Sequence, residues 1–143
     1  TCTPSGVLEP RVIKATNGKF YMYVTVGHEI WVGVDENPQG PWKNALPDNQ
    51  PLIRHKEYFY VETIDAECFV DDDGQAYLYW GSSNSGFDIE GRCLGVKLNA
   101  DMISFNGQPK DVTPPHYFEA PYMFKKNGPY YFSYSWGKSW DQA

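Results

Sequence analysis

The sequence predicts an all-β fold built from short strands and tight turns. Aromatic residues make up 17% of the chain, and they gather in short alternating runs such as 20–23 and 130–134. Such runs suit the two faces of a pleated strand. Eleven prolines and thirteen glycines interrupt the chain, and no segment keeps a 3.6-residue apolar period over three turns. Strands are therefore favoured over helices throughout.

A repeat of about 55 residues organises these strands. Glu9, Asp65 and Glu119 each stand nine positions before the glycine of an Asn-Gly or Asp-Gly pair, and they lie 56 and 54 residues apart (65 − 9 and 119 − 65). Such a pair between two alternating strands is a strong hairpin signal, because both residues tolerate a positive φ. The period holds a four-stranded sheet with loops, as a β-propeller blade requires.

The copies differ in how complete they are. Further strands follow the hairpin in the first two copies, at 29–35 and 92–98, whereas the third copy stops after its second strand. We expect residues 1–143 to form one partial β-propeller domain of about two and a half to three blades, with repeats starting near residues 9, 65 and 119. With no initiator Met or signal peptide at its start, the chain is expected to begin after processing or within a longer gene product.

The repeat also indicates where a site would lie. The first strand of each propeller blade lines the central channel, so equivalent residues of successive blades face a common axis. We therefore expect the carboxylates of Glu9, Asp65 and Glu119 to converge at one mouth of the channel. The alternative is that each one only caps or solvates the start of its strand.

Composition and spacing exclude several functions. The chain has 18 acidic against 12 basic residues and no basic cluster, which argues against nucleic acid or an anionic membrane as partner. No apolar stretch reaches membrane-spanning length. Cys2, Cys68 and Cys93 follow no metal-ligand spacing and are expected to be structural or inert thiols.

We expect no metal site and no cofactor. The acidic run 71–73 lacks the spaced ligands of a calcium-binding EF-hand loop and is expected to be a solvated turn. His28, His55 and His116 show no partner at metal-ligand or catalytic-triad spacing, and each is expected to be a surface or loop residue.

Three blocks resemble glycoside hydrolase family 43, and together they span nearly the whole chain. Residues 64–81 (IDAECFVDDDGQAYLYWG) look like the family's third-blade signature. Residues 118–123 (FEAPYM), with the following Asn-Gly and Tyr-Tyr pairs, look like its fourth-blade signature. The stretch from Val32 to Trp42, which ends in Gly-Pro-Trp, is similar to the pattern at the end of a family blade, and 51–53 (PLI) follows as expected.

The resemblance implies a five-bladed propeller and an inverting glycosidase, most often an α-L-arabinofuranosidase, arabinanase or β-xylosidase. It implies that Glu119 is the general acid and that Asp65 orients this acid and tunes its pKa. Two close carboxylates resist ionising together, which suits a proton donor. The family's general base is an Asp of the first blade, upstream of anything matched here. Glu9 instead corresponds to the second blade and is expected to line the site, with a role as the base as the alternative.

The function expected is an exo-acting arabinofuranosidase or xylosidase segment that acts on plant hemicellulose. Its partners would be an arabinose- or xylose-containing oligo- or polysaccharide and the polypeptide segments that complete the propeller, in one chain or an oligomer. We expect Glu9, Phe118 and Trp136 to bind substrate, and Trp80 to pack in the core or between blades. The alternatives are a non-catalytic carbohydrate-binding propeller and a related propeller acting on fructosides. Secretion is expected, with a cytoplasmic location as the alternative.

Overall fold

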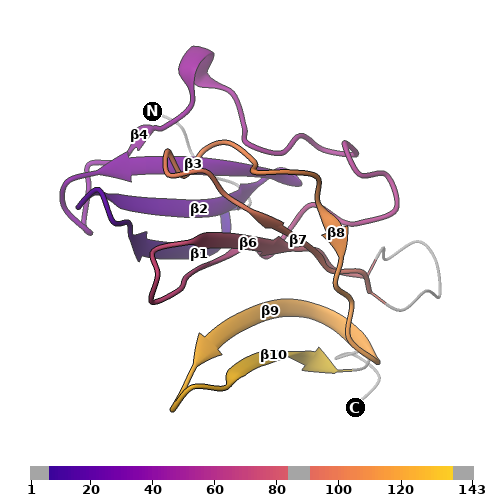
Figure 1. The fold of residues 1–143 in the computed structure, drawn as a ribbon. Helices are drawn as coiled ribbons and strands as arrows, with labels where there is room; N and C mark the ends of the chain where they lie inside the picture. Colours follow the sequence, from indigo (N-terminus) through magenta and orange to yellow (C-terminus); the bar gives the residue numbers. More distant parts are fainter. Residues whose placement is uncertain (1–6, 84–90, 137–143) are drawn as a thin grey trace.

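Three antiparallel sheets make up the computed structural model, which describes residues 7–83 and 91–136 (Figure 1). The first sheet contains β1 (Val7–Lys14), β2 (Phe20–Val26), β3 (Glu29–Asp35) and β4 (Lys43–Asn44), and a short 3-10 helix, η1 (Pro47–Asn49), follows it. The second sheet contains β5 (Glu67–Val70), β6 (Ala76–Trp80), β7 (Leu94–Lys97) and β8 (Lys110–Asp111). The third is the pair β9 (Tyr117–Lys125) and β10 (Tyr130–Trp136). Among the described residues, no helix is long and apolar enough to cross a membrane.

Strand order follows chain order in each sheet, from β1 to β4 and from β5 to β8. This meander is how a propeller blade is connected. Two four-stranded sheets followed by a two-stranded pair match the predicted two and a half blades. The first strands of the sheets contact one another in turn, β1 against β5 and β5 against β9. The three inner strands therefore lie at a common centre, as the repeat predicted.

The hydrophobic core lies between the first two sheets. Ile30 and Val32 of β3 belong to the same buried cluster as Leu78 of β6. Trp80 is fully buried. Its ring stacks on that of Phe105 with 6.1 Å between the centres and lies 5.5 Å from that of Tyr58, which confirms its predicted place in the core. Burial of this apolar surface is the main force that holds the sheets face to face.

Cys68 and Cys93 are completely buried and unpaired. Burial raises the pKa of each thiol to about 12. Because the thiolate is the reactive form, both side chains behave as small apolar residues, in line with the prediction. Cys2 lies outside the described residues.

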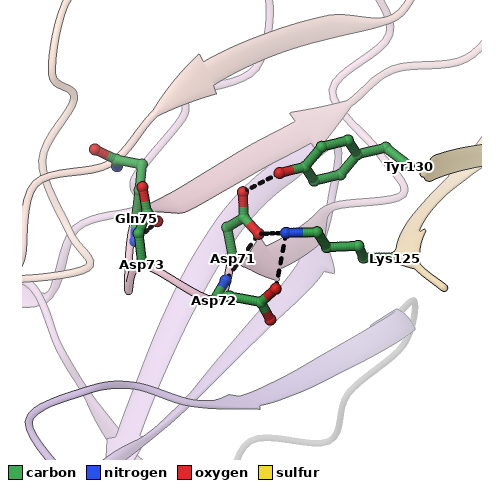
Figure 2. Close-up of polar contacts among 6 residues, drawn as sticks. All are labelled: Asp71, Asp72, Asp73, Gln75, Lys125 and Tyr130. Carbon is green, nitrogen blue, oxygen red and sulfur yellow. Dashed lines mark hydrogen bonds and ion pairs between the residues drawn. The ribbon is translucent and has the colours of Figure 1, made fainter. Parts of the chain in front are cut away.

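The acidic turn 71–73 joins the second sheet to the third (Figure 2). Lys125 Nζ lies 3.0 Å from Asp71 Oδ1 and 2.7 Å from Asp72 Oδ2, and the Tyr130 hydroxyl donates to Asp71 Oδ2 at 2.6 Å. The hydrogen bond from Tyr130 is the first cause that lowers the pKa of Asp71. The prediction of a solvated turn was therefore wrong for Asp71, because residues of β9 and the start of β10 reach across to it.

Candidate active site

A cavity of about 240 Å³ opens where the three inner strands begin. Each inner strand, together with the two residues just before β5, contributes three consecutive residues to its wall. The lining residues are Glu9, Pro10, Arg11, Asp65, Ala66, Glu67, Ala120, Pro121 and Tyr122. Three segments about 55 residues apart thus build one site, at the place where the repeat predicted a convergence.

The backbone is irregular at this point in all three strands. Glu9 (φ 41°), Asp65 (φ 56°) and Ala120 (φ 56°) lie in the left-handed region, which residues other than glycine seldom adopt. The pairing register also shifts between Leu8 and Arg11 in β1, and opposite Ala120 in β9. Such bulges re-aim side chains beside functional sites. All three strained residues line the cavity, which favours a functional role for this cavity.

Strand register shows which residues are equivalent. The hairpin pairs Lys14 with Phe20, and the next hairpin pairs Val70 with Ala76, so each spans five intervening residues (15–19 and 71–75). In the third hairpin Lys125 pairs with Tyr130 across only four residues (126–129).

Glu9 and Asp65 each lie five residues before the last paired residue of their strand, Lys14 or Val70. Five residues before Lys125, the equivalent position of the third strand is Ala120 and not Glu119. This corrects the sequence prediction, in which all three acidic residues shared one position. The sequence analysis counted nine positions back from the glycine of each turn, and this count is off by one in the third copy because its turn is one residue shorter. The shared left-handed conformation of Glu9, Asp65 and Ala120 supports the corrected alignment.

Glu9 and Asp65 line the cavity together, whereas Glu119 is not among its lining residues, although its charge acts on Asp65. Asp65 is 7% exposed, and its pKa is raised to about 7, first by burial and then by the negative charges of Glu9 and Glu119. The Glu9 carboxyl group also acts on this pKa through its closeness to Asp65, whereas the Ala120 N–H, donating to Oδ2 at 3.1 Å, lowers it. Asp65 therefore titrates near neutral pH rather than in the usual acidic range of an aspartate.

Glu119 lies beside Asp65 at the start of β9. The hydroxyl of Ser82, which is itself buried, donates to Glu119 Oε2 at 3.1 Å. The structure raises the pKa of Asp65, the carboxyl group that the sequence analysis expected to act on Glu119. Sequence reasoning missed Ser82, because nothing local links it to a residue 37 positions away.

Glu67 and Arg11 form an ion pair at the floor of the cavity, which the sequence analysis missed. Arg11 Nε lies 3.0 Å from Glu67 Oε2, and the guanidinium lies 5.1 Å from the ring centre of Tyr122. Burial raises the pKa of Glu67 to about 7 although the charge of Arg11 lowers it. One signal was available: Glu67 stands two residues after Asp65, and alternate residues of a strand share a face.

The two aromatic residues expected to bind substrate differ in exposure. Phe118 is 4% exposed, so its ring packs inside the protein and presents no face to a sugar, which corrects that prediction. Trp136 is 64% exposed at the end of β10. It pairs with Tyr117 in the sheet and makes an edge-to-face contact with His116 at 5.7 Å. Trp136 is thus free to contact a ligand from the same end of the strand pair as Glu119.

Comparison with known proteins decides the family. The model of glycosyl hydrolases family 43 matches residues 10–141, nearly the whole chain. The chain belongs to this family. Its Asp65 and Glu119 fall within the matched region, and the match confirms the resemblance noted from the sequence.

Relatives within family 43 are similar along most of this chain. It is 36% identical to a β-D-galactofuranosidase of Aspergillus niger, with 82% of this chain and 33% of that protein covered. It is 34% identical to an arabinoxylan arabinofuranohydrolase of Bacillus subtilis, with 85% and 26% covered. The chain thus spans about a third or less of the length of these two relatives.

The solved structures agree with the sequence comparison. An α-L-arabinofuranosidase of Clostridium thermocellum superimposes with a TM-score of 0.77 at 38% identity, covering 94% of this chain and 44% of that one. A family 43 arabinoxylan arabinofuranohydrolase from Bacillus subtilis, solved with cellotetraose, gives a TM-score of 0.76 at 30% identity. The fold prediction, part of a β-propeller, is therefore confirmed.

Proposed function

We propose that this chain supplies the general acid and the pKa-tuning carboxylate of an inverting glycoside hydrolase. The observation that carries the proposal is that buried Asp65, whose pKa is raised to about 7, lines the cavity with Glu9 and lies beside the partly buried Glu119. A group that protonates a leaving sugar oxygen must hold its proton at the working pH. Family 43 membership supplies the reaction class, glycosidic bond hydrolysis.

Burial separates the roles of the two carboxyl groups. Glu119 is only partly buried and receives a hydrogen bond from Ser82, which suits a side chain that must reach the substrate. Asp65 is deeply buried and held by the Ala120 N–H, which suits a group that acts on Glu119 rather than on the sugar. Glu119 is thus the proposed acid, and Asp65 is the neighbouring carboxyl group proposed to orient it.

Inversion needs a second carboxylate that activates water on the opposite face of the sugar. We assign this general base to another segment of the propeller, in the same polypeptide or in a partner chain. Glu9 lines the cavity beside Asp65, and we assign it to the wall of the site. An oligomeric assembly would serve equally well, provided that it brings the base to the cavity.

The proposed substrate is an arabinofuranosyl or xylosyl linkage in an arabinose- or xylose-containing oligo- or polysaccharide of plant hemicellulose. The names of relatives support this class, since they include a xylosidase/arabinosidase of Humicola insolens and arabinoxylan arabinofuranohydrolases. The exposed indole of Trp136 offers an apolar face on which a sugar ring could stack.

The test is Glu119→Gln in the complete protein that carries this chain. Without a proton donor, kcat/KM on arabinoxylan should fall by roughly 100- to 10,000-fold. The loss should be much smaller on a dinitrophenyl arabinofuranoside, because that leaving group departs without protonation. Glu36→Gln, at an exposed position remote from the cavity walls, is the matched control.

A non-catalytic carbohydrate-binding propeller gives the opposite results. The parent protein would then bind oligosaccharide but hydrolyse neither substrate, and Glu119→Gln would bind as the parent does. Equal losses on the two substrates would show that Glu119 matters for some reason other than proton donation, and would overturn its assignment as the acid.

A further inference from the structure

Two histidines and a glutamate meet at the surface, away from the carboxylate cluster. The possible ligand atoms of His28, His55 and Glu62 all lie within 4.8 Å of one another. His28 Nδ1 is 2.6 Å from Glu62 Oε1, and the two imidazole rings are 5.4 Å apart between their centres. The sequence analysis missed this cluster because His28 lies 27 residues from His55, on a different element.

The fold holds these side chains from two directions. His28 is the second residue of the tight turn between β2 and β3, where both Gly27 (φ 58°) and His28 (φ 64°) are left-handed, as a two-residue hairpin turn requires. His55 and Glu62 belong to the loop that leads toward Asp65. Buried Val61 and the contact of Tyr58 with Trp80 at 5.5 Å anchor this loop to the core.

We propose that His28, His55 and Glu62 bind a divalent transition-metal ion, with zinc as the best match. Two imidazoles and one carboxylate form a well-known zinc ligand set that leaves a fourth position for water. Ligand atoms bound at about 2.0–2.1 Å to a tetrahedral ion lie roughly 3.3 Å apart. The three groups reach this spacing by small side-chain rotations, and the ion replaces the proton that His28 and Glu62 share.

The site has a structural consequence. The ion would tie the β2–β3 turn of the first sheet to the loop that runs into the second sheet. Glu62 stands three residues before Asp65, and Thr63 between them is buried. Metal binding would therefore restrain the segment that positions Asp65, while taking no part in bond cleavage. This inference is independent of the proposed hydrolytic function.

The experiment is a titration of the complete, chelator-treated protein with Zn²⁺ by calorimetry and with Co²⁺ by visible absorption. The parent should bind one more equivalent than a His28→Asn/His55→Ala variant, and each single variant should bind this equivalent at least about tenfold more weakly. Asn is chosen at position 28 because it tolerates a left-handed backbone. His116→Ala, which removes a histidine outside the cluster, should bind as the parent does.

Thermal unfolding gives an independent readout. Zn²⁺ should raise the Tm of the parent and of His116→Ala, and should leave the double variant unchanged. Equal Tm values without metal show that the variants fold; if they differ, Glu62→Gln replaces the double variant in both measurements. The proposal is overturned if the parent shows no saturable binding at millimolar Zn²⁺, or if loss of these ligands leaves its stoichiometry and affinity unchanged.

Discussion

Asp65 is a buried residue of the site whose negative charge lowers the stability of the folded protein. Burial and the neighbouring charges of Glu9 and Glu119 raise its pKa from 3.8 to about 7. The folded protein therefore holds this proton more tightly than the unfolded chain does. Its contribution to stability is complete below about pH 4 and is lost as the pH rises through about 7.

Asp65→Asn should remove this dependence, because an amide never ionises. We expect the free energy of unfolding to rise by about 2–4 kcal/mol at pH 8 relative to the parent, and to change little at pH 4. Urea unfolding of the complete protein at both pH values measures this, with exposed Asp48→Asn as the isosteric control. An equal effect at the two pH values would show that the Asp65 charge is not what destabilises the fold.

At the scale of elements, the pair of Arg11 and Glu67 joins β1 to β5. The Glu67 side chain is only 5% exposed, whereas that of Arg11 is 30% exposed. Removing one partner of a buried pair leaves the other charge without compensation, which costs more than the pair contributes. The partial exposure of Arg11 reduces this effect.

Arg11→Met should therefore lower the free energy of unfolding by about 2–4 kcal/mol at pH 8. The loss should be smaller at pH 5, because Glu67, with a pKa of about 7, is then protonated in the parent as well. Urea unfolding at the two pH values tests this, with exposed Lys19→Met as the control for losing a cation. A larger loss at pH 5 would contradict the assignment of Glu67 as the partner that matters.

Gly81 connects the end of β6 to the site. Its φ is +131°, and its carbonyl oxygen accepts a hydrogen bond from the Tyr117 hydroxyl at 2.7 Å. A Cβ at this position would clash with the Arg92 carbonyl and lie 2.8 Å from Val61 Cγ1. Gly81→Ala should cost about 2–4 kcal/mol in urea unfolding. Gly107→Ala, at φ +104° in open space, carries the backbone cost alone and should lose about 1 kcal/mol. Equal losses would show that the close approach at Gly81 is relieved at no cost.

Local signals explain what the sequence could and could not reveal about these elements. The hairpins at Gly18, Gly74 and Gly128 were predictable, because turn chemistry is written in adjacent residues. The offset of Glu119 by one residue was not, because the shorter third turn appears only in the pairing of Lys125 with Tyr130. Contacts set by the loop path, such as that of His28 with Glu62, have no local signal at all.

At the scale of the whole molecule, the third sheet presents an unusual surface. The β9–β10 pair lies at one side of the molecule (Figure 1), and it exposes several large aromatic side chains. Apart from Trp136, which the proposed function leaves open to a sugar, the exposed members are Tyr122, Tyr130 and Tyr131. A strand pair with an exposed edge and an apolar face is prone to association. This surface is where the next strands of a propeller would pack, in keeping with a chain that covers 44% of the solved Clostridium thermocellum structure.

The isolated segment 1–143 should consequently be inactive. We assign the general base that works with Glu119 to another segment, and an inverting reaction stops without activated water. Hydrolysis of an aryl arabinofuranoside should be undetectable for this segment alone, and should return when the remaining segments of the polypeptide are co-expressed with it. The restored activity should vanish again if the added segments carry an Asp→Asn change at their general base. If the segment alone hydrolyses the substrate and Glu119→Gln abolishes this activity, the general base lies within the segment. The cavity is lined by the carboxylates of Glu9, Asp65 and Glu67, and Glu9 would then be the first residue to replace.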